Sequence, residues 1–176
     1  MRKLEWLSLI ELIGLAMAMT GCMVMPIKEY RPLVRTNEIL IAEVKVFKDM
    51  ELGFTGGMKN IGVAADNDPY YREVAREYIA SLKTELEKSG FTLVEGISNY
   101  QGLVIKTKIG DSPPPLGGWL GAFAMGAVVV QVEVYQNSEL VLSLEEAANT
   151  TLGYKAEKQT KKLAPRIAKK LSERFL

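Results

Sequence analysis

The chain has 176 residues, of which 48% are apolar and 24% charged, as in a single globular domain with a real core. Twenty-two basic and 21 acidic residues leave a net charge of +1, so no global charge attracts nucleic acid. With no histidine and one cysteine, the chain excludes a Cys/His zinc, haem or iron–sulfur site, an intrachain disulfide and a Ser-His or Cys-His nucleophile pair. We therefore expect no enzyme, no cofactor and no metal centre, although composition alone leaves an oxygen-ligand Ca²⁺ or Mg²⁺ site open.

The N-terminus has the layout of a secretory signal peptide over residues 1–21. Arg2 and Lys3 supply positive charge, and residues 12–20 form an apolar core of the required length. Glu11 departs from the pattern, because a carboxylate in an inserting segment costs on the order of 2.5–3.5 kcal/mol.

The apolar run ends in Met19, Thr20, Gly21 and Cys22. This sequence resembles a bacterial lipobox, in which an aliphatic residue and two small residues precede a cysteine. The resemblance implies cleavage between Gly21 and Cys22, a thioether-linked diacylglycerol on Cys22 and acylation of its new N-terminus by a chain such as palmitate. Met19 stands where Leu is usual. Met23, rather than Asp, follows the cysteine, which by resemblance to enteric sorting rules implies the outer membrane, facing the periplasm.

Two other interpretations of this segment stay open. An uncleaved transmembrane anchor is one, although residues 12–27 offer sixteen uncharged positions and a span needs about 20. A buried core helix with an incidental cysteine is the other. The lipoprotein interpretation implies stable attachment to the bilayer, since each buried methylene contributes about 0.8 kcal/mol and several chains act together.

Residues 22–37 include Pro26 and Pro32 and show no clear period, so we expect an acylated N-terminus and tether there. A globular domain is expected over 38–176. Residues 38–47 alternate between two sets, which predicts a strand with one buried face. One set is Leu40, Ala42, Val44 and Val46, and the other is Ile39, Ile41, Glu43 and Lys45.

The stretch 48–68 is expected to be a loop, rich in glycine between residues 53 and 62. Its glycines match neither the P-loop nor the dinucleotide-binding spacing, so a surface loop is favoured over a phosphate cradle.

Residues 68–90 predict a helix. Asp68 is a favoured N-cap, Pro69 suits the first helical position, and Gly90 stands where a C′ glycine is expected. Apolar residues recur at helical spacing and form one stripe: Tyr71, Val74, Ala75, Tyr78, Ile79, Leu82 and Leu86.

Strands are predicted over 91–95, 102–110, 127–135 and 140–146, the last two forming a hairpin. A closing helix over 154–176 carries an inner apolar stripe, and Pro165 should kink it or start a new segment. The order is β-α-β-β-β-β-α. Because two amphipathic helices each need an apolar surface, we predict one α+β domain, with a mostly antiparallel sheet and both helices on one face.

This layout resembles a broad set of small bacterial lipoproteins with uncharacterised domains. The segments that match are LEKSGFTLVE, GLVIKTKI and GAVVVQVEVYQNSELVLSLEE, followed by a basic closing helix. The order also resembles the amino-terminal domain of TolB and the lipopolysaccharide-assembly lipoprotein LptE, in which two helices pack on a sheet. The resemblance is architectural and implies no site residues.

Two stretches are candidate contact surfaces. Trp119, Leu120 and Phe123 lie close together between glycines and prolines, as in an exposed apolar patch, or else they begin the long strand and cap the core. The closing helix has a net charge of +6 over residues 154–176, against −5 over 22–153. Its basic face is either a solvated surface or a site for anionic lipid or an acidic partner. Its candidate contact residues are Lys158, Lys162 and Arg166.

No general acid–base pair emerges from the sequence. The leading hypothesis is a non-enzymatic envelope lipoprotein that serves as an accessory or assembly factor for an outer-membrane or periplasmic complex. Its expected partners are the membrane, through the acyl chains, and an envelope protein, but not nucleic acid. The alternative is a binding module for lipid or lipopolysaccharide that uses the basic helix and the Trp119 region.

Overall fold

A computed structural model describes residues 27–52, 58–97, 100–112, 126–150 and 155–176. The helices are α2 (Pro69–Lys88) and α3 (Ala156–Phe175). The strands are β1 (Lys28–Glu29), β2 (Glu38–Lys48), β3 (Glu51–Leu52), β4 (Met58–Asn60), β5 (Val63–Ala64), β6 (Thr92–Leu93), β7 (Leu103–Ser112), β8 (Gly126–Gln136) and β9 (Glu139–Thr150). The long elements follow the predicted order, which confirms a single α+β domain.

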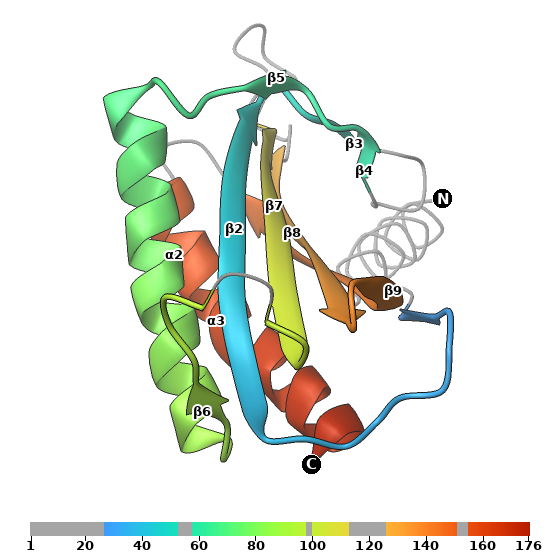
Figure 1. The fold of residues 1–176 in the computed structure, drawn as a ribbon. Helices are drawn as coiled ribbons and strands as arrows, with labels where there is room; N and C mark the ends of the chain where they lie inside the picture. The colour runs from blue at the N-terminus through green and yellow to red at the C-terminus, as the bar shows by residue number, and fades with distance from the viewer. Residues whose placement is uncertain (1–26, 53–57, 98–99, 113–125, 151–154) are drawn as a thin grey trace, which may run out of the picture.

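The domain has two layers, a seven-stranded sheet and a pair of helices packed on one of its faces (Figure 1). The strands run in the order β1-β9-β8-β7-β2-β5, and β6 also pairs with β2. The sheet is mixed, because β2 pairs in parallel with β7 and β6, while the other pairs in this sheet are antiparallel. Helix α2 carries the chain back between β2 and β7, which is the connection that a parallel pair requires.

The predicted alternation in β2 is wrong over half of its length. The register against β7 shifts between Ile41 and Glu43, as at a β-bulge. A bulge inserts one residue and moves the following side chains to the other face. Val44 therefore joins Ile41 in packing against the helices, and Leu40 is left out of the core.

The expected loop at 48–68 also needs correction, since it contains the short strands β3, β4 and β5. β3 and β4 pair with each other, and β5 pairs with the end of β2. Gly62 has φ +85°, and a Cβ there would lie 2.1 Å from the carbonyl oxygen of Lys48. A glycine is therefore needed for this close approach.

The two helices form largely as predicted. The carboxylate of Asp68 accepts a hydrogen bond from the backbone N–H of Tyr70 at 2.9 Å, and Gly90 has φ +99°. Pro165 lies inside α3 without starting a new segment. Proline has no N–H, so the backbone carbonyl of Lys161, four residues earlier, lacks its usual helical donor. Pro165 and Lys161 are both exposed, so water can bind this carbonyl. Buried residues hold the helix on both sides of it, namely Leu163, Ala164, Ile167 and Ala168.

The described part of the predicted tether lies against the domain. β1 pairs with β9 at Ser143 and Leu142, and Ile27 and Leu33 pack on the core. The side-chain amide of Gln136 exchanges two hydrogen bonds of 3.2 Å with the backbone of Val34. We call residues 27–37 the strap, because they bind β9, the β8–β9 turn and the end of α3.

Candidate functional site

Two groups of candidate residues lie outside the described residues. They are Gly21 and Cys22 at the predicted cleavage site, and Trp119, Leu120 and Phe123 in the predicted apolar patch. The basic candidates Lys158, Lys162 and Arg166 lie on α3, and all three are exposed.

Acidic residues of other elements neutralise part of the basic helix. Glu146 of β9 is only 8% exposed and receives Lys170 at 2.5 Å and Arg166 at 3.8 Å. On the other side of the helix, Lys161 pairs with Glu77 of α2 at 2.5 Å. Arg166 is therefore partly engaged inside the domain.

Lys158 and Lys162 differ from Arg166, because neither forms an ion pair with any residue that the structure describes. They are separated by one helical turn, so their side chains emerge on the same side of α3. Of the three basic candidates, these two are free to meet an anion from outside.

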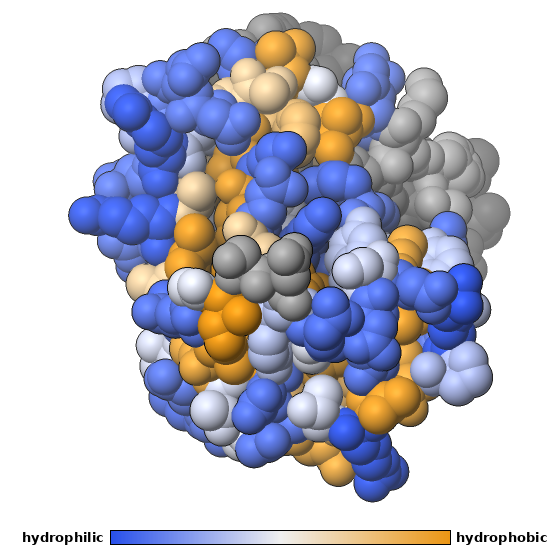
Figure 2. All heavy atoms as spheres, in the orientation of Figure 1, coloured by the Kyte–Doolittle hydropathy of each residue, from blue (hydrophilic) through white to orange (hydrophobic). Residues whose placement is uncertain are grey.

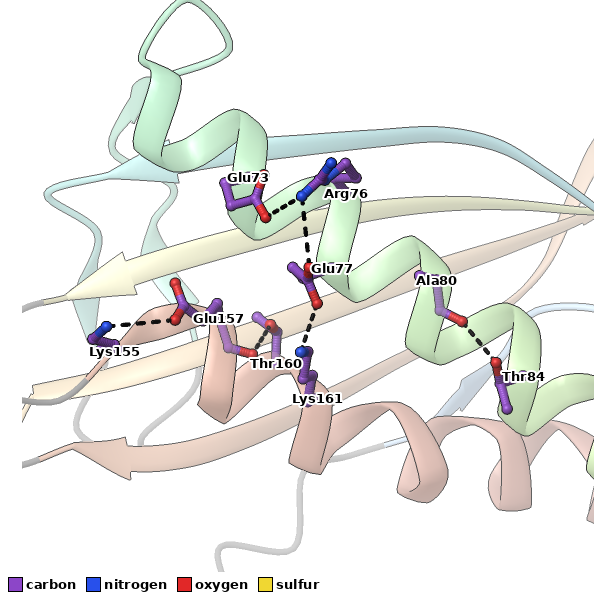
Figure 3. Close-up of polar contacts among 9 residues, drawn as sticks. All are labelled: Glu73, Arg76, Glu77, Ala80, Thr84, Lys155, Glu157, Thr160 and Lys161. Carbon is purple, nitrogen blue, oxygen red and sulfur yellow. Dashed lines mark hydrogen bonds and ion pairs between the residues drawn. The ribbon is translucent and has the colours of Figure 1, made fainter.

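The seam between the helices carries a chain of charges (Figure 3). Arg76 lies 2.5 Å from Glu73 and 3.8 Å from Glu77, and Glu77 reaches across to Lys161. The hydrogen bond from Lys161 is the main cause that holds the pKa of Glu77 below its ordinary value. The same contact raises the pKa of Lys161, so both groups are charged at neutral pH. This seam joins the helices and offers no reactive pair.

The opposite face of the sheet has a groove of about 340 Å³, which the sequence did not predict. Its lining comes from β2, β7, β8, the segment after β6 and the β8–β9 turn. The residues are Leu40, Ala42, Ile97, Tyr100, Val104, Lys106, Tyr135 and Ser138. We call it the sheet groove.

Lys106 is the charged residue that lines the sheet groove. Its ammonium lies 4.8 Å from the centre of the Tyr135 ring, a cation–π distance. Across the strands it faces Glu43 of β2 and Glu133 of β8. Both carboxylates pair elsewhere, Glu43 with Lys45 and Glu133 with Lys108, each at 2.8 Å. Lys106 has no ion pair among the described residues.

Two tyrosine hydroxyls at the groove are also engaged. Tyr100 donates to Glu38 at 3.2 Å, and Tyr135 donates to Glu133 at 3.0 Å. Desolvation is the first cause that raises the pKa of both phenols, followed by the hydrogen bond to the carboxylate. The phenols therefore stay neutral, so Lys106 is the one charged group among the residues that line the groove.

Hydrophobic residues on the side of β2 lie in separate patches among hydrophilic ones (Figure 2). Within the described residues, no helix is long and apolar enough to span a membrane. In the same part of the chain, no three His, Cys, Asp or Glu side chains are placed to hold a metal ion.

No protein-family model and no curated protein matches the chain. Solved structures similar to it include the PelC dodecamer from Paraburkholderia phytofirmans, with 12% identity and a TM-score of 0.47 over 81% of this chain and 94% of that one. A minor lipoprotein from Acinetobacter baumannii has 14% identity and a TM-score of 0.44, over 80% and 94%. Lipoprotein GNA1162 from Neisseria meningitidis has 8% identity and a TM-score of 0.41, over 78% and 99%. At these identities and scores, the likeness supports no particular function.

Proposed function

We propose that the chain is a lipid-anchored envelope protein that acts, without catalysis, as an accessory or assembly factor for an outer-membrane or periplasmic complex. The observation that carries the proposal is Cys22 in the sequence MTGC, a few residues before the strap begins to bind the domain. An acylated Cys22 would be the new N-terminus and the membrane attachment point.

The strap supports a position close to the bilayer. Five Cα–Cα steps lead from Cys22 to Ile27, and at about 3.5 Å per step they span at most about 18 Å. Ile27 packs on the core. While the strap is bound, the distance between Cys22 and the domain is therefore limited to the length of this short stretch. The β9 edge would then stay near the membrane surface, where a protein of an outer-membrane complex could meet it.

Growth on labelled palmitate tests the anchor. The full-length protein should take up label and fractionate with the outer membrane, whereas Cys22→Ser should lose the label. Label that persists in Cys22→Ser would contradict acylation at this residue.

Photo-crosslinking in intact envelopes tests the accessory role. A crosslinker at Glu139, an exposed strap-side residue that pairs with Arg31, should recover one defined envelope protein. The matched control places the crosslinker at Arg72, an exposed residue in the first turn of α2, because this end of the helix lies away from the strap (Figure 1). Equal recovery of the same protein from both positions, or of no protein from Glu139, would count against the proposal.

A second candidate, binding of anionic lipid through the basic helix, is favoured by the free lysines Lys158 and Lys162. Charge reversal at both residues should reduce binding to vesicles that contain phosphatidylglycerol. Charge reversal at Arg166 is the control, because that side chain is partly engaged with Glu146. Unchanged binding in the double variant would show that the basic helix does not bind anionic lipid.

A further inference from the structure

We propose that the sheet groove binds a single-chain carboxylate amphiphile, the anion of a fatty acid, with its head group at Lys106. This site is separate from the lipid anchor and from the basic face of α3. It does not depend on whether Cys22 is acylated.

The shape of the groove comes from the bulge in β2. The register shift between Ile41 and Glu43 leaves Leu40 and Ala42 lining the groove instead of filling the core. Val104 of β7 and Ile97 add further aliphatic surface, and Ile97 is 51% exposed. An alkyl chain lying here would cover apolar atoms that water now reaches.

Tyr100 forms one wall and is held in place on both sides. Its hydroxyl donates to Glu38, and its ring lies so close over Gly102 that a Cβ there would be 2.2 Å from the hydroxyl oxygen. Gly102 therefore allows the ring to lie down beside the aliphatic surface, where it narrows the groove.

Lys106 gives the groove its charge preference. The carboxylates nearest to it in the sheet, Glu43 and Glu133, are already paired with Lys45 and Lys108. An incoming anion would therefore meet an ammonium that shares Glu43 with Lys45 and forms no ion pair of its own, held above the ring of Tyr135. A ligand cation would meet repulsion at the same point.

The balance of charge favours a carboxylate over a phosphate monoester. A monoester carries about −1.5 to −2 charges at neutral pH, and a carboxylate carries one. Lys45, Lys106 and Lys108 share the two carboxylates of Glu43 and Glu133, so this part of the sheet has one positive charge in excess. One negative charge is matched, whereas a second would face these carboxylates.

The experiment uses the full chain in phosphatidylcholine nanodiscs, with empty nanodiscs as the blank and methyl NMR as the readout. Octanoate should shift the methyl signals of Leu40, Ile97 and Val104 saturably. Lengthening the chain to decanoate should tighten binding by up to about fourfold per methylene. Octyl phosphate and octyltrimethylammonium should bind more weakly than octanoate.

Variants test the two halves of the groove separately. Lys106→Gln should weaken octanoate binding by up to about fivefold, because it removes an ion pair at an exposed position. Lys158→Gln is the matched control, since it removes an equally unpaired cation from α3 and should leave binding unchanged. Ala42→Phe, at an exposed position, should fill the groove and abolish the methyl shifts while the circular dichroism spectrum stays native.

Three results would overturn the proposal. One is unchanged octanoate binding in Lys106→Gln, and another is binding of octyltrimethylammonium as tight as that of octanoate. The third is tighter binding of octyl phosphate, which would contradict the carboxylate head group.

Discussion

The hydroxyl of Tyr70, in the first turn of α2, accepts a hydrogen bond of 3.0 Å from the backbone N–H of Ala156, in the first turn of α3. Helix α3 has no side-chain cap of its own, because Lys155 at the N-cap makes no such bond. One helix therefore caps the other. Burial is the main cause that raises the pKa of Tyr70, so the acceptor is a neutral hydroxyl at physiological pH.

Tyr70→Phe should lower the free energy of unfolding by about 1–3 kcal/mol, because it leaves the buried N–H of Ala156 without its acceptor. Urea denaturation measures the change. Tyr30→Phe is the control, since Tyr30 is 53% exposed and its hydroxyl makes no hydrogen bond within the described residues. Equal effects of the two variants would show that the cap contributes nothing.

Glu146→Gln should destabilise the domain by about 1–3 kcal/mol, because Lys170 and Arg166 both lose their charged partner at a buried position. Glu173→Gln is the comparison. Its pair with Lys169 is 3.9 Å long and its side chain is 54% exposed, so its effect should be close to zero. Chemical denaturation of the two variants decides whether Glu146 holds α3 on β9.

The pair between Lys161 and Glu77 should make the stability of the domain depend on pH in the acid range. The pKa of Glu77 is lower in the folded protein than its ordinary value of 4.5. Stability from this pair is thus fully present above that ordinary value and is lost as the pH falls through the folded pKa.

The measurement is the difference in urea midpoint between wild type and Glu77→Gln. It should favour the wild type at pH 7 and shrink as the pH falls below about 4. A difference of constant size from pH 7 to pH 3 would contradict the charge pair as its cause.

The β8–β9 turn should be stabilised by Ser138→Gly. Asn137 and Ser138 have φ of 51° and 67°, the left-handed conformation of a two-residue hairpin turn. Asn tolerates this conformation, whereas Ser is strained there. The substitution should raise the thermal midpoint, with a gain of about 0.5–1 kcal/mol.

Ser81→Gly inside α2 is the opposite control, because it should destabilise by a similar amount. Calorimetry compares the two variants. A loss of stability in Ser138→Gly would show that the serine side chain matters more than the backbone strain.

The helices could be predicted from the sequence because their signals are local. Asp68 accepts the first free N–H of α2, and Gly90 adopts the positive φ expected after a helix. The inner stripe of α3 is buried throughout, at Leu163, Ala164, Ile167, Ala168, Leu171 and Phe175. These features depend on neighbours within a few residues, so the chain itself specifies them.

The bulge in β2 could not be predicted in this way. Leu40 and Ala42 alternate correctly with their neighbours, and nothing local distinguishes them from Val44 and Val46. Only pairing with β7 shows that the register shifts between the two pairs. The sheet groove was missed for this reason.

By itself the sequence determined the order of the long elements, the helix ends, the core stripes of the helices and the prediction of an anchor at Cys22. The tertiary structure decided which charges of α3 are free, because Glu77 and Glu146 come from distant parts of the chain. It also decided that the strap lies on the domain and that Lys106 forms no ion pair of its own among the described residues. Local patterns follow from backbone geometry, whereas the partner of a charge follows from contacts that form only when the sheet and helices pack together.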